Sequence, residues 1–379
     1  MRLCPLLFLL LIRALLAGEG PAPPAYPLWD GQESVARYAE RVGLPPTVTL
    51  ECGNGVKLEL VLIPAGKFMM GTPEPEVVDE KSYFRKIEWG IGLLTVSGSL
   101  LLVLMGSILA RAIINRRRPQ FSLARLLAMA LAASVSVLSG MHWWHSAQAL
   151  ETAKVEYETL SYHYLYMVAR LDEKPAHTVT LTRPFYMGKF EVTQKQYDQV
   201  TGWSNSQIKG KDLPEEAVTW NKAQEFCKRI SGQTKRTVRL PTEAEWEYGC
   251  RGGTRTPYFS GDTFQALDRV AWYNENAKQT THPVGQKDPN VFGLYDMHGN
   301  VWEWCHDWYE VDYYSKSPNE DPQGPAMGAD RVLHGGYFGH YYPECRAANR
   351  RFDDGSGSGV TYFHFVGFRV VEELAFRAP

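Results

Sequence analysis

Two carboxylates in the run DMHGNVWEW (296–304) are spaced so that they could hold a cation. Asp296 and Glu303 supply side-chain oxygens, and Gly299 permits a sharp turn between them. Backbone carbonyls of the same run would complete the roughly six to eight oxygens that calcium takes. The alternative is that each carboxylate accepts backbone N–H groups at a turn, without a metal. The run therefore predicts a structural calcium site or a pair of turn caps.

Sulfur and imidazole groups gather near the C-terminus. Cys345 lies in GGYFGHYYPECRAANR (335–350), and His334, His340 and His364 fall near the same loops. Three histidines could ligate zinc or iron, but their spacing is not tight, and histidines on polar loops are more often solvated or hydrogen-bonded. Trp302 is expected to pack in the core. The sequence has no Gly-Lys-Ser phosphate loop, no GxSxG elbow and no dinucleotide fingerprint.

The composition describes a folded chain with an aromatic core. The sequence has 379 residues, 44% of them hydrophobic and 22% charged, so neither disorder nor a very small domain is expected. The net charge of -2 makes nucleic acid an unexpected partner. With 33 glycines, 11 tryptophans and 20 tyrosines, the chain suits a turn-rich domain rather than a helix bundle. Six cysteines are too few for a disulfide scaffold.

The N-terminus is typical of an exported protein. A charged start, a short apolar run and the small residues Ala17 and Gly18 predict a signal peptide over 1–18, and the alternative is an anchor that stays attached. Residues 19–46 follow as a proline-rich linker and a short N-terminal segment.

Two long uncharged stretches predict a transmembrane hairpin. They span about 89–110 and 126–147, each long enough to cross the hydrocarbon. The connection between them is rich in arginine, which places it in the cytoplasm by the positive-inside rule. Residues 31–87 and 151–379 would then lie on the extracytoplasmic (periplasmic or exterior) face, where disulfides are permitted. A buried hairpin in a soluble core is the alternative.

Periodicity predicts a few regular elements. Residues 47–72 alternate apolar and polar side chains and turn at 64–66, which predicts two strands in a hairpin. Residues 177–193 alternate again and are expected to form strands. Residues 214–231 have helical spacing. Thr242, with Glu245 three residues on, predicts the start of another helix.

Five cassettes in order resemble one known family. They are RLPTEAEWEYGCRGG (239–253), NVFGLYDMHGNVWEWCHDWY (290–309), RVLHGG (331–336), CRAANRR (345–351) and FVGFRVV (365–371). Together with LELVLIPAGKFMMGT and FYMGKFEVTQKQY, they resemble the formylglycine-generating enzyme, or sulfatase-modifying-factor, family. The resemblance covers 57–74 and 172–372 and implies an α+β fold related to C-type lectins, with little regular secondary structure.

The resemblance also implies a divided domain. First strands over 47–74 and a main part over 172–373 would be separated by an insertion at 75–171 that carries the predicted transmembrane helices. In the alternative, residues 31–74 do not pack against the rest.

The resemblance assigns candidate sites. The family's structural calcium site matches Asp296, Gly299, Val301 and Glu303, the middle two through backbone oxygens. Oxidases of the family carry two cysteines, five residues apart, that bind copper(I), and counting from Gly335 places His340 and Cys345 there. A second alignment places CRAANR just beyond the catalytic pair, so that both catalytic cysteines are missing. Trp302 matches a pocket-lining position, and His340 would lie in the same pocket.

The same resemblance pairs Cys250 with Cys345 in a disulfide; the alternative is two buried free thiols. Cys227 matches another disulfide position whose partner is Val370 here, so it is expected to be unpaired.

Two functions follow from these assignments. The first is a membrane-tethered binding or scaffold module that lacks the two-cysteine copper site and meets a protein partner through the loops 335–342 and 353–362. The alternative is a formylglycine-generating oxidase, with copper at Cys345 as its catalytic residue, acting on a sulfatase-like client.

Overall fold

The computed structural model describes residues 26–73, 171–356 and 363–374. All of the described residues belong to one compact unit. Every helix among the described residues is too short or too polar to cross a bilayer. The predicted signal peptide and the two predicted spans lie outside the described residues.

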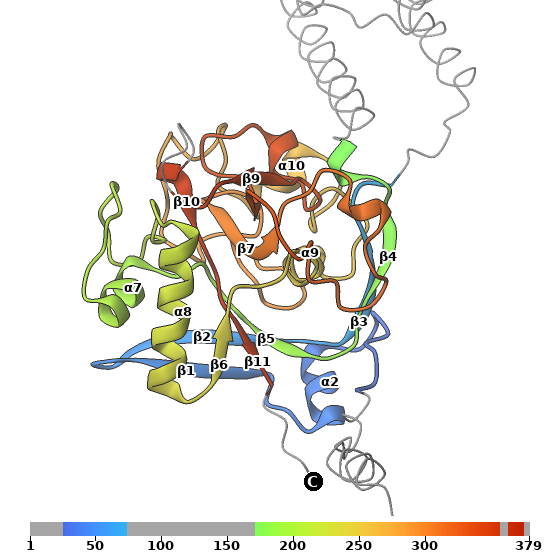
Figure 1. Cartoon of the computed structure of the whole chain (residues 1–379), viewed down its shortest axis with the longest axis horizontal. Coiled ribbons are helices and arrows are strands. Elements are labelled where there is room, and N and C mark those ends of the chain that lie inside the picture. The colour runs from blue at the N-terminus through green and yellow to red at the C-terminus, as the bar shows by residue number, and fades with distance from the viewer. Residues whose placement is uncertain (1–25, 74–170, 357–362, 375–379) are drawn as a thin grey trace, which may run out of the picture. The chain divides into compact units, whose positions relative to one another are not determined.

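Short helices and strands make a mixed α/β fold (Figure 1). The helices are α2 (Val35–Val42), α7 (Gln194–Thr201), α8 (Trp220–Thr234), α9 (Glu243–Arg251) and α10 (Phe264–Asp268). The first strands are β1 (Thr47–Gly53), β2 (Val56–Ile63), β3 (Gly66–Met70), β4 (His177–Leu181), β5 (Phe185–Gly188) and β6 (Thr237–Arg239). The later strands are β7 (Trp302–Trp308), β8 (Arg331–His334), β9 (Arg351–Asp353), β10 (Val366–Gly367) and β11 (Val371–Glu373).

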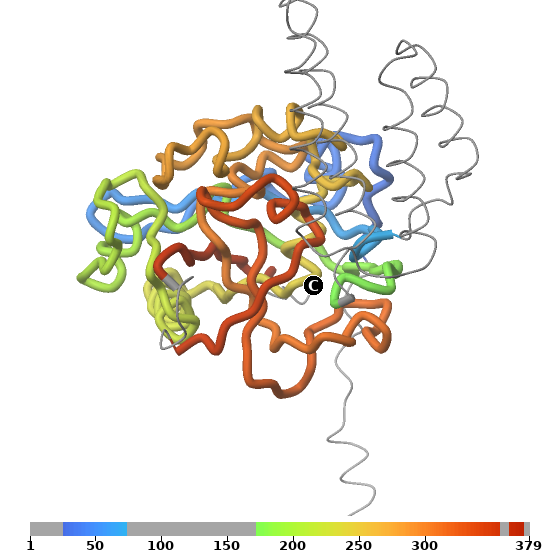
Figure 2. Tube along the Cα trace, turned by 90° about the horizontal axis from the view of Figure 1, so that it is seen from above, coloured from blue at the N-terminus to red at the C-terminus, as the bar shows by residue number. Residues whose placement is uncertain are grey.

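The largest sheet joins distant parts of the chain. Its strand order is β1-β2-β5-β11-β6, so a strand from each end of the described chain flanks β5. Figure 1 shows blue β2 and red β11 in this sheet, with α8 alongside. A second sheet has the order β10-β7-β8-β9, and β3 pairs with β4 alone. Residues 47–70 therefore pack against the later segments, and the tube in Figure 2 follows this interleaving.

The predicted hairpin forms at a different turn. β1 and β2 are joined at Asn54 and Gly55, both with positive φ (48° and 76°). Asn-Gly is the preferred pair for a two-residue hairpin turn because both positions need this conformation. The turn expected at 64–66 instead carries the chain from one sheet to the other, since β3 pairs with β4.

Two helix predictions have different outcomes. The capping box of Thr242 and Glu245 is present at the start of α9, as predicted. Helix α8 begins at Trp220, after the N-cap Thr219, rather than near 214. The residues before it are not helical because Ala217 has φ +58° and the carboxylates of Glu215 and Glu216 accept backbone N–H groups from the loop 205–208.

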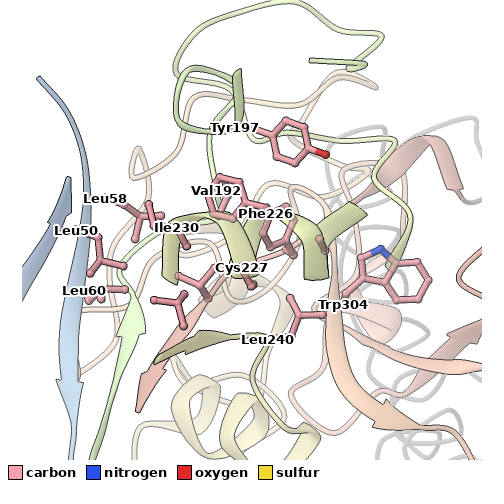
Figure 3. Close-up of a cluster of buried hydrophobic side chains, with 14 of the residues drawn as sticks. Leu50, Leu58, Leu60, Val192, Tyr197, Phe226, Cys227, Ile230, Leu240 and Trp304 are labelled. Atoms are coloured by element: carbon pink, nitrogen blue, oxygen red, sulfur yellow. The ribbon is translucent and has the colours of Figure 1, made fainter. Parts of the chain in front are cut away.

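The aromatic core lies between α8 and the large sheet (Figure 3). Leu58 and Leu60 from β2 lie in the same buried cluster as Phe226 and Ile230 from α8. The rings of Tyr197 and Phe226 are parallel, with centroids 5.6 Å apart. Cys227 is a buried free thiol in this cluster.

Glu216 should make stability depend on pH. Burial raises the pKa of this carboxyl from 4.5 to about 7. The folded protein therefore binds the proton more tightly than the unfolded chain, so the group's stabilisation is complete below about pH 4.5 and is lost as the pH rises through about 7. Glu216→Gln should flatten this fall in thermal midpoint, whereas Glu40→Gln, at an exposed position of α2, should not. Equal slopes for both variants would contradict the assignment.

Candidate functional site

The loop 335–345 turns back so that its first residues lie beside its last. It leaves β8 through Gly335 and Gly336, whose φ values are +98° and +79°. A Cβ atom at Gly336 would lie 2.9 Å from Cys345 Sγ. Glycine is therefore needed here both for the backbone conformation and for the close approach of Cys345.

Trp302 and His340, the two residues predicted to lie in one pocket, are in ring contact. Their ring centroids are 5.2 Å apart and nearly perpendicular, and Tyr337 lies 4.2 Å from His340. The Tyr337 ring also stacks on Phe365 at 4.6 Å. Trp302 and His340 are both buried, and burial lowers the pKa of His340 to about 3. The group is thus an aromatic cluster around a neutral imidazole.

Cys345 is buried at the end of this loop. Its side chain is completely buried, and burial raises the pKa of its thiol well above 9. The thiolate is the form that attacks substrates and binds soft metals. At neutral pH, Cys345 therefore carries its proton and is not poised for either reaction.

The disulfide between Cys250 and Cys345 is not formed. Both are free buried thiols in the described part of the chain. The imidazole of His298 contacts both cysteines: its Nε2 lies 3.7 Å from Cys250 Sγ, and its Nδ1 donates to the Cys345 carbonyl oxygen at 2.7 Å. The amide N–H of Phe259 donates to Nε2, which fixes the tautomer. Hydrogen bonding through His298 thus links the two segments without a covalent bond.

Glu303 is bound by an arginine that the sequence reasoning did not include. Arg369 Nε and Nη2 donate to the two Glu303 oxygens at 2.6 Å each, and Trp246 Nε1 donates to Oε2 at 2.8 Å. All three side chains are buried. Arg369 stands in FVGFRVV, where a charged residue among apolar ones could have signalled a buried partner.

Asp296 lies in the same buried region. Its Oδ2 accepts the Gly285 N–H at 2.7 Å, and its Oδ1 is buried without a hydrogen bond among the described residues. Glu191, another residue that the sequence reasoning missed, accepts from Asn300 Nδ2 and the Val301 N–H. Burial raises the pKa of both carboxyls, of Asp296 to about 6.

These contacts do not fit the four-residue calcium site. Asp296 has one open oxygen, but both Glu303 oxygens already accept from Arg369, whose positive charge disfavours a cation beside them. The calcium assignment stays a prediction. If the Arg369–Glu303 pair stays intact in solution, added calcium should leave the thermal midpoint unchanged relative to EDTA. A calcium-dependent rise that Asp296→Asn abolishes would instead support the assignment of Asp296, Gly299, Val301 and Glu303.

The three C-terminal histidines do not converge. His334 Nε2 lies 3.1 Å from Glu243 Oε1, His364 Nδ1 lies 2.6 Å from Gln207 Nε2, and His340 packs on Trp302. Among the described residues, no three His, Cys, Asp or Glu side chains are grouped to hold a metal.

Comparison with known proteins decides the family. Residues 148–374 match the FGE-sulfatase family, described as a sulfatase-modifying factor enzyme 1-like domain. This chain belongs to that family. It is 36% identical to the chaperone protein LppX of Paenibacillus barcinonensis, with 35% of this chain and 64% of that protein covered. It is 38% identical to the formylglycine-generating enzyme of Streptomyces coelicolor, with 41% and 51% covered.

A solved structure shows a similar fold. PvdO from Pseudomonas aeruginosa superposes with a TM-score of 0.54 at 22% identity, covering 87% of this chain and 99% of that one. The two sequence relatives are each matched over less than two thirds of their own length. Family membership and fold are therefore shown, and the activity of any whole relative is not transferred.

A pocket of about 310 Å³ adjoins the loop 335–345 in this FGE-sulfatase domain. The backbone N–H of Asn274 donates to the His340 carbonyl oxygen at 2.9 Å, and the rings of Phe264 and Tyr342 lie 5.8 Å apart. Trp302 and His340 are not among the residues that line this pocket. The sequence reasoning did not single out any of the lining residues.

Gly299 is indispensable to this FGE-sulfatase domain for steric reasons. Its φ is +115°, and a Cβ atom would lie 2.1 Å from the Trp272 carbonyl oxygen. Gly299→Ala is expected to lower the free energy of unfolding by about 2–4 kcal/mol through backbone strain and clash. Gly43→Ala, at φ +69° with open space around it, should cost about 1 kcal/mol. Denaturant titration of both variants checks this, and equal losses would contradict it.

Proposed function

We propose that this chain is a binding module of the FGE-sulfatase family that recognises a protein partner through the loop 335–342 and does not perform copper-dependent oxidation. The carrying observation is that Cys345 is completely buried and packed against Gly336, and this burial raises the pKa of its thiol. Copper(I) prefers soft thiolate ligands. The loop offers one buried thiol, Cys345. When residues are counted from Gly335, the position of the other catalytic cysteine is occupied by His340.

The surface of the loop supports recognition. Tyr341 is 60% exposed although its neighbours His340 and Cys345 are buried. Tyrosine offers a large contact area with a polar tip and loses little side-chain entropy on binding. A relative that bears the name of a chaperone is consistent with a role that acts on another protein. The loop 353–362 is proposed as the second half of this surface.

The proposal includes the membrane. The uncharged stretches at 89–110 and 126–147 would tether the domain and place it on the extracytoplasmic face. Protease treatment of intact cells or spheroplasts tests this side, since the domain should be cleaved there while a cytoplasmic marker is protected. Cleavage only after lysis would contradict it.

Photo-crosslinking tests the binding surface. A benzoylphenylalanine at Tyr341 in the full chain, expressed in its own host, should give a discrete adduct. The same probe at Val311, which is 54% exposed, is the matched control. Absence of an adduct at Tyr341, or the same adducts at both positions, would contradict recognition by this loop.

An activity assay tests the oxidase alternative. The relatives named as formylglycine-generating enzymes justify it. The purified chain with copper and a cysteine peptide of sulfatase type should form no aldehyde above the Cys345→Ser variant. Aldehyde formed by the wild type and lost in that variant would replace the binding module with an oxidase.

A further inference from the structure

The pocket beside the loop is built from one helix and the chain that follows it. Its lining residues are Phe264, Asp268, Tyr273, Glu275, Asn276 and Lys287. Its volume of about 310 Å³ lies at the lower end of the ~300–1,000 Å³ typical of small-molecule sites. It therefore has room for one small ligand or one ring of a longer chain.

The walls of the pocket are held in place by hydrogen bonds among themselves. Tyr273 Oη donates to Asp268 Oδ1 at 2.7 Å, and Asn276 Nδ2 donates to the same oxygen at 3.3 Å. The Asn276 Oδ1 accepts the Tyr273 N–H at 3.0 Å. These contacts organise the polar groups before any ligand arrives, which lowers the entropy lost on binding.

An anionic and a cationic side chain of the pocket, Asp268 and Lys287, can both form further hydrogen bonds. Asp268 Oδ1 takes both of those bonds, and no donor to Asp268 Oδ2 is found among the described residues. Lys287 Nζ donates to the Asp268 carbonyl oxygen at 2.6 Å and lies 4.1 Å from the centre of the Trp272 ring. Because an ammonium has three donors, Lys287 keeps further N–H groups available.

This combination selects against simple ions. A cationic ligand would meet Lys287, and an anionic one would meet Asp268 and Glu275. A hydroxyl group both donates and accepts, so it satisfies an open carboxylate oxygen and an ammonium together. The rings of Phe264 and Tyr273 add apolar surface for the C–H face of a ligand.

We propose that this pocket binds a sugar ring, with vicinal hydroxyls at Asp268 and Lys287 and an apolar face against Phe264. The site adjoins the loop surface proposed for the protein partner, but none of its lining residues belongs to the loop 335–342, so variants can test the two proposals independently. A free sugar and the terminal ring of a glycan present the same chemistry.

Saturation-transfer NMR on the full chain tests the proposal. The chain is purified without a sugar-headed detergent and mixed with the methyl glycosides of glucose, galactose, mannose and N-acetylglucosamine, and with the free sugars. We expect transfer to at least one glycoside. Transfer to the methyl glycoside and the free sugar alike indicates recognition of the ring, whereas transfer to the methyl glycoside alone indicates a glycan end.

Variants of the lining residues test whether the saturation-transfer signal comes from a sugar bound in this pocket. Asp268→Asn keeps the size of the side chain, and both it and Phe264→Ala should weaken binding at least tenfold while the thermal midpoint stays near that of wild type. Glu225→Gln, on exposed α8 surface, should bind like wild type. No transfer to any sugar, or transfer unchanged in the pocket variants, would overturn the proposal. Nα-acetyl-lysine methylamide is included as a control ligand, and transfer to it but to no sugar would overturn the proposal in favour of a cationic side chain.

Discussion

Arg369→Met should be among the most damaging single changes in the described core. Arg369 is fully buried, and it also donates to the carbonyl oxygens of Gly188 and Tyr295. Its loss would leave the Glu303 carboxylate buried near Glu191 and Asp296 without a cation. Breaking a buried ion pair from one side costs about 3–5 kcal/mol, so we expect the free energy of unfolding to fall by that amount. Urea or guanidinium titration followed by circular dichroism measures it.

An exposed ion pair supplies the matched control. Arg229 Nε lies 2.7 Å from Glu225 Oε1 on the surface of α8, with both side chains nearly half exposed. Arg229→Met should cost at most about 1 kcal/mol. Adding Glu303→Gln to Arg369→Met should recover part of the loss, because the uncompensated charge is then removed. A loss for Arg369→Met no larger than for Arg229→Met would show that the buried pair does not hold the core.

Local signals predicted local structure well. The capping box at Thr242 needs only residues three apart, so α9 could be placed from the sequence. The predicted hairpin turn is misplaced because the apolar end of β2 runs directly into the turn residues 64–66, which outweighed the Asn54-Gly55 signal. The pairing of β5 with both β2 and β11 depends on contacts far apart in the chain, which no local pattern encodes.

The candidate site was harder to predict because its chemistry is set by distant partners. Asp296 and Glu303 looked like oxygen ligands, but Glu303 meets an arginine 66 positions away. The resemblance pairs Cys250 with Cys345 in a disulfide, yet His298 contacts both residues and they remain thiols. A residue's type indicates what it could do, and only the three-dimensional arrangement decides which partner it has.

Arg346→Met should separate residues 70–73 from residues 171–175, which lie on either side of the segment 74–170 in the sequence, as well as destabilise the domain. Arg346 Nη1 and Nη2 donate to the Glu173 oxygens at 2.7 and 2.8 Å, and Nη1 donates to Thr72 Oγ1 at 3.1 Å. Thr72 Oγ1 in turn donates to Glu173 at 2.6 Å. One arginine therefore holds both the strand end before this segment and the turn after it. Because Glu173 is fully buried, its loss of this partner should cost about 3–5 kcal/mol.

Amide hydrogen exchange separates this local opening from general destabilisation. The Thr72 N–H donates to the Glu173 carbonyl oxygen at 3.1 Å. Its protection from exchange therefore reports whether residues 70–73 and 171–175, here called the two stems, stay together. Arg351→Met is the control, since Arg351 stands five residues on and pairs with Glu344 at 3.1 Å, with both side chains about one third exposed. In Arg346→Met, we expect residues 70–73 and 171–175 to lose protection before the core strands β2 and β5. If both variants exchange alike there, the stems are held by the pairing of β3 with β4 alone, and Arg346 is not what joins them.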